Sequence, residues 1–158
     1  MTALIKNSQK SLQTDKRRLR KITEDLLIFS GQPGKDLSIL FVDNKKIARF
    51  NKQFFGKDRP TNVISFSYME NKEIPAGYDF PNEIIGDIII SLEKAKEEAE
   101  ALSCHFYERV FALIIHGLLH ISGHDHINDK NEARRMRYRE KKFLDYVCSH
   151  QLYKELTE

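Results

Sequence analysis

Four of the six histidines fall within eleven residues, at positions 116, 120, 124 and 126. His116 and His120 are four residues apart, so on a helix both imidazoles lie on one face, at a separation that one metal ion can bridge. Gly123 stands where a helix end favours a left-handed residue, and a reversal of the chain there could bring His126 to the same point. Three imidazole nitrogens and one open position are typical of catalytic zinc sites. The spacing therefore predicts one Zn²⁺ per chain, held by His116, His120 and His126.

The same spacing is the skeleton of a protease signature, H-E-x-x-H-x-x-G-x-x-H, with Gly117 at the position of its glutamate. In those proteases the glutamate is the general base that activates water for peptide cleavage. The ligands are present here and the base is missing, which argues against a peptidase. A glycine inside a helix costs about 1 kcal/mol relative to alanine. Close packing against a strand and close approach of a substrate explain Gly117 equally well.

Two further residues of this segment have no settled role. His124 falls outside the spacing of the three ligands, so we expect it near the metal or at the surface. Asp125 stands beside a predicted ligand and fits three roles: a carboxylate that orients an imidazole N–H, a proton acceptor, or a turn residue. The chemistry of the segment therefore depends on the elements around it.

The chain alternates strand-like and helix-like patterns. Residues 103–122 are apolar nearly all round, which predicts a central buried helix that carries the metal site. Strands are predicted at 4–5, 37–42, 62–66 and 84–90, other helices at 15–29, 43–54, from 91 and at 129–156, and an exposed loop at 67–82. This order predicts a single α/β or α+β domain with about four strands, and it does not determine their arrangement in the sheet.

The charge is unevenly distributed, although Lys+Arg 26 and Asp+Glu 23 leave a net charge of only +3. Residues 15–21 and 129–142 each carry a net +4, so the remainder is at −5. Each basic segment is either a solvated helix face or a phosphate-binding surface. The second follows the histidines closely, so we take from it three candidate RNA-binding residues, Arg134, Arg135 and Arg137.

Two features indicate where the protein works. Cys104 and Cys148 are too few for a disulfide framework or a cysteine zinc cluster. The longest apolar run, 110–115, is far shorter than the ~20 residues of a membrane span, and the first residues lack a secretory pattern. We expect a cytoplasmic protein that does not associate with a membrane.

Three stretches of the chain together resemble the YbeY endoribonucleases, the bacterial rRNA maturation factors. They are His116-Gly-x-Leu-His120-x-x-Gly123-x-Asp125-His126, Pro60-Thr-Asn-Val-Ile-Ser-Phe66 and Ile85-Gly-Asp-Ile-Ile-Ile-Ser91. The resemblance extends from about residue 37 to 147. It implies an α+β fold, with a small mixed sheet of about four strands and about five helices, and one YbeY-like metallo-endoribonuclease domain over 1–158.

The resemblance also implies a function. It implies a zinc-dependent, single-strand-specific endoribonuclease in rRNA (16S 3′ end) maturation and ribosome quality control, whose partners are single-stranded RNA or rRNA and the ribosome or its small subunit. Zinc would be bound by His116, His120 and His126. The alternatives are a metal-dependent hydrolase of another substrate, such as a peptide, and a non-catalytic ribosome-associated metal protein.

The chain departs from the family pattern at Phe55, where the family has an arginine before Gly-Lys-Asp. In the family this arginine is expected to contact an RNA phosphate. Lys57 and Arg59 are the neighbouring cations that could contact that phosphate here. The catalytic candidates are His116, Asp125 and Arg59. The general base could be a metal-bound hydroxide, Asp125 or another residue, or the reaction could proceed without one. The RNA 2′-OH could itself be the nucleophile.

Overall fold

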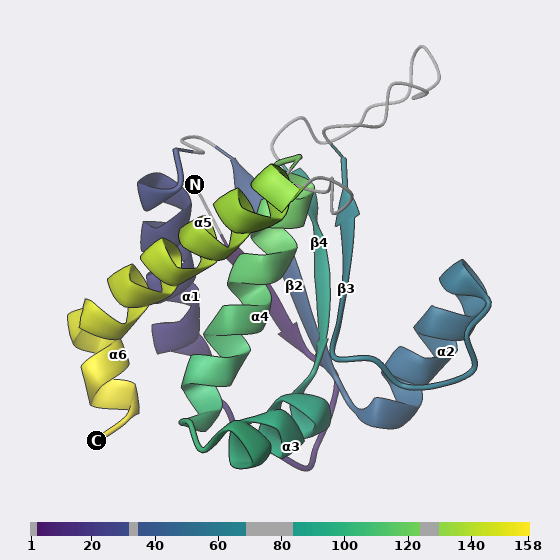
Figure 1. Cartoon of the computed structure of the whole chain (residues 1–158). Coiled ribbons are helices and arrows are strands. Elements are labelled where there is room, and N and C mark those ends of the chain that lie inside the picture. Colours follow the sequence, from purple (N-terminus) through teal and green to yellow (C-terminus); the bar gives the residue numbers. More distant parts are fainter. Residues whose placement is uncertain (1–2, 32–34, 69–83, 124–129) are drawn as a thin grey trace.

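The structure, a computed structural model, describes residues 3–31, 35–68, 84–123 and 130–158. Within these residues four strands form one mixed sheet, and six helices pack around it (Figure 1). The strands are β1 (Ala3–Asn7), β2 (Asp36–Val42), β3 (Val63–Ser67) and β4 (Ile84–Ser91). The helices are α1 (Lys16–Phe29), α2 (Asn44–Phe55), α3 (Leu92–Leu102), α4 (Phe106–Ile121), α5 (Lys130–Ser149) and α6 (Gln151–Leu156). The predicted α+β fold is confirmed, with one helix more than expected.

The strands lie in the order β1-β2-β4-β3. β1, β2 and β4 are parallel, whereas β3 runs antiparallel to β4 and forms one edge of the sheet. β3 extends through Ser67, the first residue of the predicted loop. Tyr68 continues the pairing by donating its backbone N–H to the carbonyl of Ile85, and the rest of that predicted loop lies outside the described residues.

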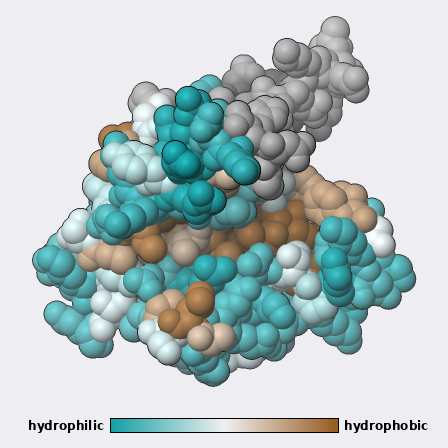
Figure 2. Space-filling model, viewed as in Figure 1, coloured by the Kyte–Doolittle hydropathy of each residue, from teal (hydrophilic) through white to brown (hydrophobic). Residues whose placement is uncertain are grey.

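Side chains alternate between the two faces of the sheet, and each face packs differently. Ile5, Ile39 and Ile88 belong to the main core, which also contains buried side chains of α1, α4 and α5. Ile89 of β4 belongs to a smaller cluster on the other face, which includes Ile47 of α2. The outer surfaces of the helices over the main core are mostly hydrophilic, with a band of apolar residues between them (Figure 2).

α4 is the central buried helix that the sequence predicts. It contacts β3 and β4 on one side and α3 and α5 on the others, and nine of its residues are buried. It begins at Phe106 rather than at 103 because Ser103 ends α3 in the left-handed region and the His105 side chain accepts the N–H of Tyr107. Neither α4 nor any other helix in the described ranges is long and apolar enough to cross a membrane.

The prediction of one helix over 129–156 is wrong, because the chain breaks between α5 and α6. His150 has extended backbone angles, φ −69° and ψ 136°, and its Nδ1 accepts the N–H of Leu152 at 3.1 Å. Its Nε2 lies 2.7 Å from the Asp25 carboxylate of α1. This contact with a distant helix ends α5 where the local pattern would continue. Asp129, the first residue of the predicted helix, lies outside the described residues.

Candidate metal centre

His116 and His120 lie on one face of α4, as their spacing predicts. Their Nε2 atoms are 2.9 Å apart, and both side chains are only partly buried, so both nitrogens face one accessible point. His124, Asp125 and His126 lie outside the described residues. Accordingly, no group of three or more His, Cys, Asp or Glu side chains suited to a metal ion occurs among the residues that the structure describes.

Glu140 of α5 contacts the other nitrogen of His116. Its Oε1 lies 3.1 Å from His116 Nδ1. Metal-binding histidines usually donate their second N–H to a carboxylate, which fixes the tautomer and leaves Nε2 free to bind. In the sequence, Asp125 is a candidate for such a role and Glu140 is not, because Glu140 is 24 residues from His116 and lies on a different helix.

The two histidines open into a cavity of about 280 Å³ along the edge strand β3. The lining comes from α2, the turn after it, β3 and α4: Asn51, Phe55, Lys57, Thr61, Val63, Ile64, Ser65, His116 and His120. Among these described lining residues there is a lysine and no carboxylate. The cavity is therefore suited to an anionic group beside the imidazoles.

Asn51 holds the turn that brings Lys57 to this cavity. Its side chain is buried, and its Nδ2 donates to the backbone carbonyl of Arg59 at 2.9 Å. The Asn51 carbonyl in turn accepts the N–H of Lys57 at 3.3 Å, next to Gly56, which ends α2 in the left-handed region. Of the two candidate cations, Lys57 lines the cavity, whereas Arg59 is exposed on the same turn and does not.

Gly117 packs against the sheet. A Cβ at this position would lie 3.0–3.1 Å from three side-chain carbons of Ile88 in β4. Of the two explanations open from the sequence, this contact favours close packing. Gly123 has a φ of 93°, which confirms the predicted left-handed residue after α4.

The predicted RNA-binding arginines are exposed on α5. Arg135 pairs with Glu132 of the same helix at 2.8 Å. Arg137 lines a second cavity, of about 330 Å³, between α4 and α5, together with Arg109, Lys141 and Glu140. Through Glu140 this surface adjoins His116.

The other basic segment, on α1, lies elsewhere in the fold. α1 contacts β1, at the edge of the sheet opposite to β3. Arg18 pairs with Asp15 and Glu155, Arg20 with Glu24 and Lys21 with Asp25. These ion pairs favour a solvated helix face for α1.

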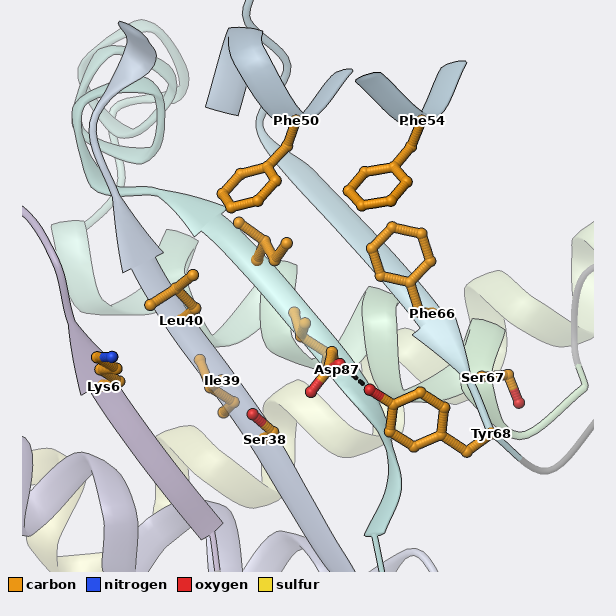
Figure 3. A pocket seen from close by; sticks show the side chains of 12 residues that line it. Lys6, Ser38, Ile39, Leu40, Phe50, Phe54, Phe66, Ser67, Tyr68 and Asp87 are labelled. Carbon is orange, nitrogen blue, oxygen red and sulfur yellow. Dashed lines mark hydrogen bonds between the residues drawn. The ribbon is translucent and has the colours of Figure 1, made fainter. Parts of the chain in front are cut away.

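A larger cavity, of about 570 Å³, lies on the face of the sheet away from α4 and includes neither histidine (Figure 3). Phe50, Phe54 and Phe66 gather at one end of it. At the other end Tyr68 donates its hydroxyl to the Asp87 carboxylate. Burial and this hydrogen bond raise the pKa of Tyr68 to about 12, so the phenol stays protonated at neutral pH.

The sequence model of the family described as Endoribonuclease YbeY matches residues 4–147. A relative with that name from Geobacter sulfurreducens is 41% identical over 145 residues, which are 91% of this chain and 94% of the relative. Another from Carboxydothermus hydrogenoformans is 37% identical over 142 residues, covering 89% and 93%.

The fold has a solved counterpart as well. The solution structure of TM1509 from Thermotoga maritima matches with a TM-score of 0.64 and 25% sequence identity, over 92% of this chain and 89% of that one. The family match begins 33 residues before the resemblance seen in the motifs, and so includes α1 and all but the first residue of β1. On the sequence match and the coverage of these relatives, the chain belongs to the YbeY family of endoribonucleases.

Proposed function

We propose that this chain is a zinc-dependent endoribonuclease specific for single strands, acting on rRNA, including the 16S 3′ end, in ribosome maturation and quality control. Residues 1–158 act as one catalytic domain, in the cytoplasm and at the ribosome or its small subunit. The observation that carries the proposal is the pair of imidazoles, 2.9 Å apart, in a cavity whose described lining includes a lysine and no carboxylate. Membership of an endoribonuclease family supports the choice of RNA.

The described residues fit a zinc ion as far as they extend. His116 and His120 direct their Nε2 atoms at one point, and Glu140 occupies the other nitrogen of His116 as ligand histidines require. His126 is the proposed third ligand. When bound, zinc supplies a Lewis acid that polarises a phosphoryl oxygen or lowers the pKa of a water.

The chain's own residues would bind and orient the RNA. Lys57 is placed to hold a phosphate beside the imidazoles, while Arg137 is placed to hold the strand farther along, between α4 and α5. Arg134 and Arg135 are proposed to add phosphate contacts from the exposed side of α5. Asp125, His116 and Arg59 are the candidates for proton transfer or charge stabilisation at the cleaved bond.

A cleavage assay tests this function. The purified protein is mixed with one RNA sequence as a single strand and as a duplex, before and after metal is removed with a chelator and replaced with Zn²⁺. We expect cleavage of the single strand only, lost with the chelator and restored by zinc. Equal cleavage of both forms, or activity that survives full removal of metal, would contradict the proposal.

Glu140 gives a prediction about metal affinity. Removing a carboxylate that orients a metal-binding histidine typically weakens metal binding about 10- to 100-fold. We expect Glu140→Gln, whose amide oxygen still accepts the hydrogen bond, near the lower value, and Glu140→Ala near the higher one. Competition with a chromophoric zinc chelator measures the affinity. Glu132→Gln on the same helix is the matched control, and an equal loss there would show that Glu140 has no special role.

Lys57 gives a prediction about RNA binding. Each phosphate contact to a single strand contributes about −0.7 to the slope of log K against log salt concentration. Lys57→Gln should make the slope less negative by roughly that amount and should weaken the binding of all RNA sequences alike. Fluorescence anisotropy of a labelled single strand across a salt series measures both. Lys52→Gln, on the outer side of α2, is the control; a slope that changes equally in both variants would exclude a phosphate contact from Lys57.

A further inference from the structure

Phe55 is an exposed aromatic side chain in the cavity that also holds the two histidines. It is the last residue of α2, it is 53% exposed, and it lines the same cavity as His116 and His120. Single exposed apolar side chains are common on protein surfaces, but a ring that lines a cavity beside a candidate metal site can also bind the apolar part of a ligand.

One contact holds the backbone next to Phe55, and another orients its ring. Gly56, directly after it, donates its N–H to the carbonyl of Lys52 and ends the helix. The ring lies parallel to that of Phe66 in β3, with 4° between the planes and 6.3 Å between the centroids. Phe54, one residue earlier, meets the same Phe66 ring edge-on at 5.0 Å. The helix end and the ring of Phe66 therefore orient the exposed ring of Phe55.

We propose that Phe55 is a stacking surface for an unpaired nucleobase of the RNA, next to the phosphate that is cleaved. This inference rests on the proposed function. The lining supplies what one nucleotide needs: a lysine and two imidazoles for the phosphate, and an aromatic ring for the base. Proteins that bind single strands without reading their sequence combine a cationic groove with aromatic side chains in this way.

The stacking would also add to a preference for single strands over duplexes. In a duplex each base is already stacked and paired inside the helix, so its face is not available to Phe55. An unpaired base can turn onto the ring while its phosphate lies at the histidines. Phe55 is thus a specificity-determining residue, whereas Lys57 binds single-stranded and duplex phosphates alike.

A tryptophan reporter tests the inference, because the chain contains no tryptophan. In Phe55→Trp the single indole is expected to be quenched within milliseconds of mixing the zinc-loaded protein with a single-stranded oligouridine, before cleavage. An abasic ribose–phosphate oligomer of equal length should leave the fluorescence nearly unchanged. Phe29→Trp is the control, since Phe29 is also exposed (40%) but stacks on Tyr146, away from the cavity. Equal quenching by both oligomers at position 55 would overturn the inference.

Affinity measurements with Phe55→Ala complete the test. Loss of one base–aromatic stack should weaken binding of oligouridine roughly 5- to 150-fold, with zinc content and binding of the abasic oligomer unchanged, and Phe55→Tyr should restore it. An equal loss for both oligomers, or no loss for either, would overturn the role of Phe55. If the wild-type protein binds and cleaves RNA in that case, the proposed function stands; if it binds no RNA, both fail.

Discussion

Replacing His120 with alanine is expected to leave the purified protein without zinc and to lower its rate of RNA cleavage at least about 1000-fold. A bound metal contributes several kcal/mol to stabilising charge in the transition state, and each 1.36 kcal/mol is tenfold in rate, so losing about 4 kcal/mol gives this factor. Elemental analysis gives the zinc per chain, and a fluorogenic single-stranded RNA gives the rate. A variant that retains one zinc per chain would remove His120 from the ligand set.

Because of the position of His120, the loss of zinc and activity can be distinguished from unfolding of the protein. Its side chain is only partly buried, at the cavity, while the residues before and after it in α4, Leu119 and Ile121, are buried in the core. The alanine variant should therefore keep its helical circular dichroism. His105→Asn is the matched control, because asparagine preserves the cap at the start of α4 and His105 lies outside the cavity. It should keep both zinc and activity.

The sequence predicts the histidine helix well because its signals are local. The apolar residues from Val110 to Ile121 recur on every face, which indicates burial whatever the neighbours are. The four-residue spacing of His116 and His120 alone places both rings on one side. Gly123 indicates the helix end because glycine, without a Cβ, readily adopts the left-handed conformation found there.

The features that the sequence did not predict depend on residues far apart in the chain. Glu140 contacts His116 only because α5 packs on α4, and nothing in its own segment distinguishes it from the other acids. The break at His150 coincides with a contact to Asp25 of α1, 125 residues away. Asn51 reads as an ordinary polar residue of a helix, although its side chain holds the turn that carries Lys57. The order of the strands likewise depends on pairings that hydrophobic patterns do not encode.

Gly86→Ala is expected to destabilise the fold clearly more than Gly117→Ala does. A Cβ at this position in β4 would lie 2.3 Å from the backbone oxygen of Phe66 in β3 and 2.8 Å from the Cδ1 of Ile121 in α4. The first contact is with backbone in a paired strand, so relief requires the strands to separate. Overpacking of this kind costs about 3 kcal/mol, the upper part of its usual range. For a chain of this size the loss lowers the melting temperature by roughly 6–12 °C, measurable by circular dichroism.

Gly117→Ala is the matched control, because it adds the same methyl group from the other side of the same interface. Its nearest neighbours are side-chain atoms of Ile88, which can shift, and alanine gains up to about 1 kcal/mol over glycine in a helix. We expect its melting temperature to change by only a few degrees. Because Ile121 directly follows His120, Gly86→Ala should also displace the end of α4 and weaken zinc binding. Equal melting temperatures for the two variants would show that the packing of β3 and α4 does not depend on the missing side chain at Gly86.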